Sequence, residues 1–285
     1  MVVPEKPMGQ AAEHYRRGVF DLEFVRSGSR TAVGRQNVCY PFHFTRPFSL
    51  DAAIPSLLTV YQQSSSGGMY RADDLSCRYR LRSGAASHVT TQSATVVHDC
   101  KGVPARQDCE ITLEESSFLA LTPDPFILFP GASLVSTLNA RLAPGAVLLL
   151  ADIFAMHDPE ARSRPFCDVA FDTAVRDDGN RLLVRDRFRV SGTDFVGRAS
   201  PVGGWRTVAS FLILGPPSRL PSREKLGEFG LNSRALIGVS ALANGAGWGL
   251  RCLAGDAIEG RRVAESVFFA CVLAAFGERP VKRRK

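Results

Sequence analysis

The side chains best suited to chemistry in this 285-residue chain are histidines, cysteines and carboxylates at short spacings. A His-Asp-Cys run at residues 98–100 is followed nine residues later by Cys109, and Cys39 and His43 form a separate Cys-x3-His pair. Structural metal sites usually combine two paired half-sites, whereas each half-site here is single. We therefore predict no permanent metal site, and the metal ligand set stays unknown. A weak, transient site for a borderline metal such as nickel stays open.

Sequence motifs that assemble a catalytic centre are missing. The chain has no G-x-x-x-x-G-K-[ST] phosphate loop, no H-E-x-x-H zinc motif and no G-x-S-x-G nucleophile turn. His88, His98 and Asp99 remain as candidates for acid–base chemistry, but their spacing supplies neither a nucleophile nor an orienting acid. The sequence favours a protein that is not an enzyme, with a hydrolase using these three residues as the alternative.

A polar stretch, His-Val-Thr-Thr-Gln-Ser-Ala-Thr, occupies residues 88–95. Threonine favours strands because its β-carbon is branched, so one interpretation is a polar sheet face. The other is a row of hydroxyl and amide groups that lines a wet channel or an interface.

The charge of the chain is modest once its distribution is considered. Lys and Arg total 35 against 28 Asp and Glu, a net charge of +7, and residues 282–285 carry +4 of it. The near balance of residues 1–281 disfavours a nucleic-acid binder, which needs a basic face on the folded domain. A basic stripe has strand periodicity and predicts either a solvated sheet face or a docking surface for an acidic partner: Arg181, Arg185, Arg187 and Arg189.

The apolar segments predict a cytoplasmic protein without membrane association. The longest apolar run, residues 267–276, is too short to cross a bilayer. Residues 1–17 lack the apolar region of a secretory signal. Seven cysteines without a C-x-x-C pair indicate reduced thiols.

Hydrophobic residues alternate with polar ones from about residue 19 to residue 214, with turn signals between the runs. No helical pattern interrupts this succession, which argues against a doubly wound α/β sheet. We predict a flexible segment at residues 1–18 and one β-rich domain at 19–276. That domain carries helices near 233–243 and 262–276, and a basic tail follows at 277–285. The strand-and-turn rhythm between residues 83 and 152 suggests a solenoid-like stack.

The chain resembles the UreD (UreH) family of urease accessory proteins over roughly residues 20 to 275. No single motif is specific, but the ordered set is. Its strongest segments are Thr-Thr-Gln-Ser-Ala-Thr at 90–95, Pro-Ala-Arg-Gln at 104–107, LALTPDPFILF at 119–129 and Pro-Gly-Ala at 130–132, with Arg-Pro-Phe at 46–48 and Asp-Ile at 152–153.

This resemblance implies a mainly β fold, a β-helix-like stack of many short strands with a small C-terminal helical element. It implies a non-enzymatic maturation factor that joins UreF and the GTPase UreG, docks on apo-urease and assists GTP-dependent nickel insertion. Nickel would pass transiently through an internal tunnel, with no permanently bound cofactor. Five residues match the family's polar motif and are expected at the tunnel or its supporting shell, the alternative being ordinary turn and sheet hydrogen bonding: Asp73, Thr90, Thr91, Gln92 and Gln107.

Two arginines depart from the family pattern. Arg71 stands where the family has a glycine, and Arg164 stands where it has an acidic residue. If that acid helps to pass a metal ion, its role falls to Glu160 or Asp168, or the protein is a divergent paralogue with lower efficiency.

Overall fold

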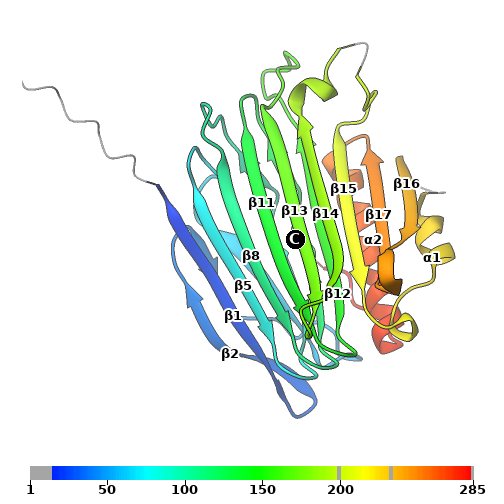
Figure 1. Cartoon of the computed structure of the whole chain (residues 1–285). Coiled ribbons are helices and arrows are strands. Elements are labelled where there is room, and N and C mark those ends of the chain that lie inside the picture. Colours follow the sequence, from blue (N-terminus) through cyan, green and yellow to red (C-terminus); the bar gives the residue numbers. More distant parts are fainter. Residues whose placement is uncertain (1–14, 198–199, 231–233, 284–285) are drawn as a thin grey trace, which may run out of the picture.

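The computed structural model describes residues 15–197, 200–230 and 234–283, and about half of them lie in the strands of two facing β-sheets (Figure 1). Sheet A has the strand order β14-β13-β11-β8-β5-β1-β2. Its strands are β1 (Arg17–Ser27), β2 (Arg30–Val38), β5 (Asp74–Leu81), β8 (Ala105–Leu113), β11 (Ser133–Leu142), β13 (Asp168–Asp177) and β14 (Leu182–Ser191).

Sheet B has ten strands, eight of them in the order β16-β17-β15-β12-β9-β6-β4-β3, while β7 and β10 join beside β12. Its strands are β3 (Phe42–Phe44), β4 (Leu57–Ser64), β6 (Ala86–Thr91), β7 (Thr95–Val97), β9 (Phe118–Leu121), β10 (Phe126–Leu128), β12 (Val147–Met156), β15 (Thr207–Leu214), β16 (Ala235–Ala241) and β17 (Gly247–Ala254).

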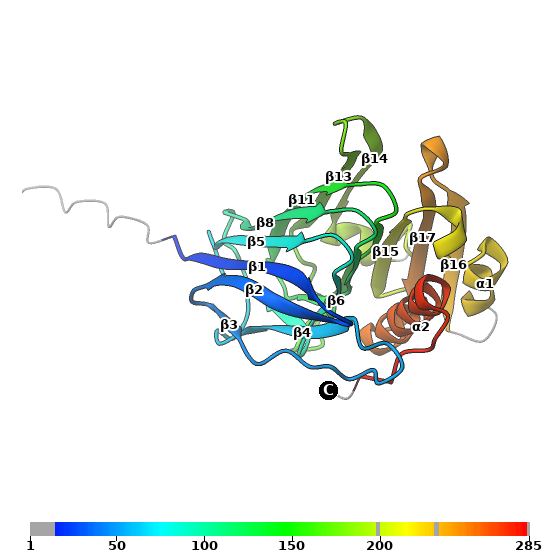
Figure 2. The ribbon, with the colours of Figure 1, turned by 90° about the horizontal axis from the view of Figure 1, so that it is seen from below.

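The connection between the sheets makes the fold a solenoid. From β5 to β13 the chain passes repeatedly from sheet A to sheet B and back (Figure 2). Each pass stacks on the previous one in parallel, as β5 on β8 and β8 on β11 in sheet A, and β6 on β9 and β9 on β12 in sheet B. This confirms the predicted β-helix-like stack.

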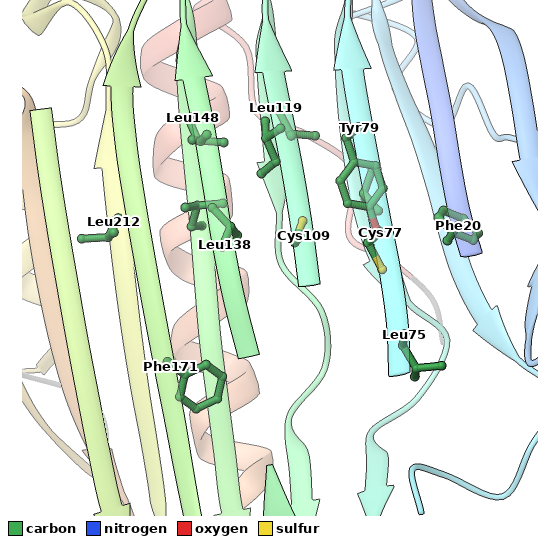
Figure 3. Close-up of a cluster of buried hydrophobic side chains, with 14 of the residues drawn as sticks. Phe20, Leu75, Cys77, Tyr79, Cys109, Leu119, Leu138, Leu148, Phe171 and Leu212 are labelled. Atoms are coloured by element: carbon green, nitrogen blue, oxygen red, sulfur yellow. The ribbon is translucent and has the colours of Figure 1, made fainter. Parts of the chain in front are cut away.

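Two hydrophobic layers stabilise the stack. The first lies between the sheets, where Phe20, Tyr79 and Leu148 are fully or almost fully buried (Figure 3). The second lies between sheet B and helix α2 (Ala257–Phe276). Strand β12 serves both layers, because Leu148 faces sheet A and Leu149 faces α2. A strand buried on both faces explains the continuous apolar run of its sequence.

Helix α2 confirms the helix predicted near 262–276, although it begins at Ala257. Asp256 caps the helix because its carboxylate accepts the Glu259 N–H at 2.8 Å, and Gly277 ends it in a left-handed conformation (φ 76°). No described helix is long and apolar enough to cross a membrane.

The helix predicted near 233–243 is wrong, because residues 235–241 form edge strand β16. Ile237 and Val239 are β-branched and half-buried, while Leu236 and Gly238, which alternate with them, are exposed. Pairing with β17 therefore outweighs the local helix signal. Residue 233, where the predicted helix begins, lies outside the described residues, and so do residues 1–14 of the predicted flexible segment 1–18.

Both predicted terminal segments extend too far into the folded domain. Arg17 and Gly18 belong to β1, and Arg16 pairs with Asp73, so residues 16–18 are part of the fold. Arg283, expected in a solvated basic tail, is buried against Asp51. A local charge pattern could not reveal these long-range partners.

Candidate functional site

A cavity of about 290 Å³ lies between the two sheets. Strands β4, β5, β6, β8, β11 and β12 supply its walls, together with the segments at residues 66–69 and 92–96. Its polar lining includes Gln62, Thr91, Gln107, Ser136 and Asp152.

Stacking in register places part of this lining in rows. Leu75, Gln107 and Ser136 are consecutive partners across β5, β8 and β11. One level along, Cys77, Cys109 and Leu138 form a second row. Side chains on the same face of stacked parallel strands lie side by side, so an inward polar residue on one strand adds to the polarity of the row. Gln107 and Ser136 thus make a polar step in a mostly apolar interior.

The thiol and phenol groups of the cavity are held in their protonated forms. The Tyr79 hydroxyl donates to Gln62 Oε1, and Gln62 Nε2 donates to Cys77 Sγ at 3.6 Å. Burial raises the pKa of the Cys77 thiol to about 12, and it raises the pKa values of Cys109 and Tyr79 well above their ordinary values. A metal ion bound by either thiol would have to displace a proton that burial holds firmly, because the thiolate is the form that ligates a metal.

Asp152 places a carboxyl group on the sheet B side of the cavity. Burial, aided by the charge of Asp186, raises the pKa of Asp152 to about 7, and Arg251 opposes this shift. Arg251 itself donates to Asp186 at 2.6 Å. The family resemblance included Asp152 without assigning it a role. The sequence signal was a single acidic residue inside the apolar run of β12.

Three of the five predicted site residues line the cavity: Thr91, Gln92 and Gln107. Thr91 Oγ1 accepts the Asp124 backbone N–H at 2.8 Å. Gln92 is exposed, and its Oε1 accepts from Gln63 Nε2 at 2.7 Å. These contacts orient the polar groups without enclosing them.

The other two predicted residues, Thr90 and Asp73, do not line this cavity. Thr90 is buried on the opposite face of β6, where its hydroxyl donates to the Thr122 carbonyl at 2.7 Å. Asp73 is 2% exposed, pairs with Arg16 and accepts the Tyr70 N–H at 2.8 Å. Both positions agree with a supporting role.

The remaining candidate ligands are scattered. His98 stacks on Tyr70 with ring centres 4.4 Å apart, whereas His88 stacks on Phe268 of α2. Asp99 Oδ1 accepts the Lys101 N–H at 2.9 Å. His88 therefore does not share a site with His98. Among the described residues, no three His, Cys, Asp or Glu side chains are grouped to hold a metal ion, and all seven cysteines are free thiols.

Arg164 and three of the four arginines in the basic stripe pair with neighbouring acids. Arg164 contacts Asp158 at 2.8 Å and Glu160 at 2.9 Å. In the basic stripe, Arg185 and Arg187 share Asp172, and Arg189 pairs with Asp168. The stripe therefore matches the solvated-face interpretation. Neither Glu160 nor Asp168 lines the cavity.

Comparisons with known proteins agree with these features. The family model described as UreD urease accessory protein matches residues 16–285. "Urease accessory protein UreD 1" of Methylorubrum populi is 42% identical, covering 99% of this chain and 98% of its own. "Urease accessory protein UreD 3" of Bradyrhizobium sp. (strain ORS 278) is also 42% identical, covering 93% of each chain. "Urease accessory protein UreD 1" of Pseudomonas syringae pv. syringae is 34% identical, covering 89% and 90%. The chain therefore belongs to the UreD family of urease accessory proteins.

Proposed function

We propose that this protein is a non-enzymatic scaffold in urease maturation and that nickel passes through the cavity between its sheets. It would act with a UreF-like protein and a UreG-like GTPase on apo-urease, with GTP hydrolysis driving the insertion. Family membership supports the role in maturation. The free thiols support action in the reducing cytoplasm.

The observation that carries the proposal is the mixed chemistry of the cavity. The cavity offers amide and hydroxyl oxygens that could act as weak ligands for a divalent cation such as nickel, from Gln62, Thr91, Gln107 and Ser136. A conduit needs groups that stabilise the ion without trapping it, since an ion held too tightly does not move on. The protonated thiols of Cys77 and Cys109 meet this requirement better than thiolates would.

Asp152 supplies the negative charge that such a path needs. With its pKa raised to about 7, this carboxyl group is partly protonated near neutral pH. A cation that approaches it would favour loss of the proton, and regaining the proton would favour release of the cation. We therefore assign Asp152 the role of a transient contact for the ion.

A blocking variant tests this path. Ser136→Phe places an aromatic ring where the Ser136 side chain lines the cavity, and Asn139→Phe is the matched control because Asn139 is exposed on the same strand. In a deletion strain without a second copy of the gene, S136F should leave urease assembled but poor in nickel, while N139F should support normal activity. Urease activity and nickel content are the measurements, and co-purification with a UreF-like protein checks that the scaffold is intact.

Two results would contradict the proposal. If the deletion strain kept full, nickel-loaded urease, the chain would have no required part in maturation. If S136F folded, bound its partners and restored full nickel content, the cavity would not be the path.

The hydrolase alternative gains nothing from the geometry, since His88 and His98 occupy different environments. Alanine at His98 and Asp99 should leave complex assembly and urease activation intact. Turnover of an ester or amide panel that disappeared in these variants would restore the enzyme interpretation.

A further inference from the structure

The segment that follows α2 is fastened to the rest of the molecule by one buried ion pair. Arg283 Nη2 lies 2.7 Å from Asp51 Oδ2, and its Nη1 donates to Asp51 Oδ1 at 3.2 Å. The two side chains are only 5% and 1% exposed. The Val281 N–H also donates to Asp51 Oδ1 at 2.6 Å. Asp51 therefore anchors this segment through both its backbone and its arginine.

The same guanidinium group contacts strand β6 and helix α2. Arg283 Nε donates to His88 Nδ1 at 3.4 Å, and the guanidinium carbon lies 5.3 Å from the centre of the Phe268 ring. The His88 ring stacks on Phe268 at 3.9 Å. Arg283 thus joins the loop before β4, β6, α2 and the C-terminal segment at one point.

From His88 the contacts continue to the wall of the cavity. Because Nδ1 accepts a hydrogen bond from Arg283, Nε2 carries the proton in neutral His88 and donates to Thr122 Oγ1 at 2.8 Å. The carbonyl of Thr122 accepts from the Thr90 hydroxyl. Two residues further on, the Asp124 N–H donates to Thr91 Oγ1 inside the cavity. One network therefore crosses sheet B from its outer face to its inner face.

An arginine is well suited to this position. Its planar group presents five N–H donors in a fixed fork, so it can satisfy a carboxylate, a ring nitrogen and a carbonyl together. Arg283 uses this capacity on Asp51, His88 and the Val281 carbonyl. A buried ion pair is weak evidence for stability, because desolvation offsets much of the attraction. The more informative property of this ion pair is that it fixes the positions of Asp51, His88 and the Val281 carbonyl around one guanidinium group.

We propose that Arg283 is a positioning residue that fixes β6 and residues 122–124, and thereby sets the place of Thr91 in the cavity wall. The placement of Thr91 by Arg283 involves contacts within this chain alone. Only its consequence for urease activation rests on the proposed function.

Amide hydrogen exchange of the full-length protein tests the positional claim. Asp51→Asn removes the charge of one partner with little change of shape, and Arg283→Gln removes the charge of the other together with its guanidinium fork. We expect each variant to speed the exchange of the Val89, Thr90 and Thr91 amides about tenfold, while β15 and β11 stay protected. In the double variant these amides should exchange no faster than in the faster of the two single variants, because both substitutions disrupt the same ion pair.

Two further variants complete the design. Lys282→Gln is the matched control, since Lys282 is 76% exposed and 3.9 Å from Glu265, and it should leave exchange unchanged. Arg283→Lys keeps the charge but loses the fork, so it should restore protection only partly. If R283Q is poorly folded, D51N and R283K carry the test.

A second readout follows the cavity directly through its cysteines. Alkylation of Cys77 and Cys109 by iodoacetamide should be faster in R283Q than in the parent protein, with exposed Cys39 as the internal standard. Unchanged β6 exchange and alkylation would overturn the proposal, and so would an equal rise in exchange throughout both sheets. A loosened β6 with normal urease activation would instead count against the cavity as the nickel path.

Discussion

Thr90 and Thr91 are consecutive residues of β6, yet their hydroxyl groups lie on opposite sides of sheet B. Thr90 donates to the Thr122 carbonyl on the side of α2, whereas Thr91 lines the cavity and accepts from the Asp124 N–H. Alternation of side chains along a strand produces this division. The polar motif therefore contains one supporting residue and one cavity residue side by side.

This division predicts different consequences for two similar substitutions. Thr90→Val leaves the Thr122 carbonyl without that donor and should lower the free energy of unfolding by about 1–2 kcal/mol. Thr91→Val should cost less stability but lower nickel delivery, because it removes a cavity oxygen. Urea unfolding and urease nickel content measure the two effects. Equal losses of nickel delivery in both variants, at equal amounts of folded protein, would contradict the assignment.

Asp152 predicts a specific pH dependence of stability. Its pKa is raised from 3.8 to about 7 in the folded state, so the folded protein holds this proton more tightly than the unfolded chain. The contribution of Asp152 to the free energy of unfolding is therefore full below about pH 4 and is lost as the pH rises through about 7. Asp152→Asn should stabilise the protein at pH 8 by on the order of 2 kcal/mol, less than the whole shift implies because the carboxyl borders the cavity.

Urea unfolding of D152N and the parent protein at pH 4.5 and pH 8 measures this effect. The two proteins should differ little at the lower pH and clearly at the higher one. The same variant should deliver less nickel despite its greater stability. A D152N protein that was less stable than the parent at pH 8 would contradict this prediction, because it would show that the ionised Asp152 carboxylate stabilises the folded state.

Substitution of Asp73 should lower the free energy of unfolding without a direct effect on the cavity. Asp73→Asn weakens the pair with Arg16 and the acceptor for the Tyr70 N–H, so it should cost about 1–3 kcal/mol. Asp74→Asn is the matched control, since Asp74 is 47% exposed and 3.7 Å from an exposed Arg17. That change should cost less than about 0.5 kcal/mol. Chemical denaturation distinguishes the two, and similar midpoints would refute the supporting role of Asp73.

The contacts of Arg164 predict that an acidic residue at this position would lower the stability of the protein. Hydrogen bonds from Arg164 hold the pKa of Asp158 far below its ordinary value of 3.8, so this contribution to stability is present at neutral pH and is lost under acid conditions. Arg164→Glu would place a carboxylate beside Asp158 and Glu160, and it should lower the melting temperature at pH 7 more than at pH 3. Arg162→Glu is the comparison because the Arg162 side chain is 72% exposed and pairs with Glu160 at 3.3 Å, so this change should lower the melting temperature less. A melting temperature that R164E left unchanged at pH 7 would contradict this account.

Alternation along the strands determined much of the fold in advance. The period-two pattern and its turn signals led correctly to a single stack of strands, and the apolar run near residue 267 led to α2. The same approach failed at β16, where pairing with β17 decided the structure. It also failed for Arg283, because its partner Asp51 lies 232 residues away in the chain.

Within the site, the ordered polar motifs were enough to indicate the family and the residue types available to it. Strand stacking places Thr91, Gln92 and Gln107 around one cavity with Asp152, while Thr90 and Asp73 lie outside it. A strand pattern fixes which side chains share a face, because successive side chains alternate between the two faces of a sheet. Which faces meet, and which charges become buried between them, depends on how the strands stack.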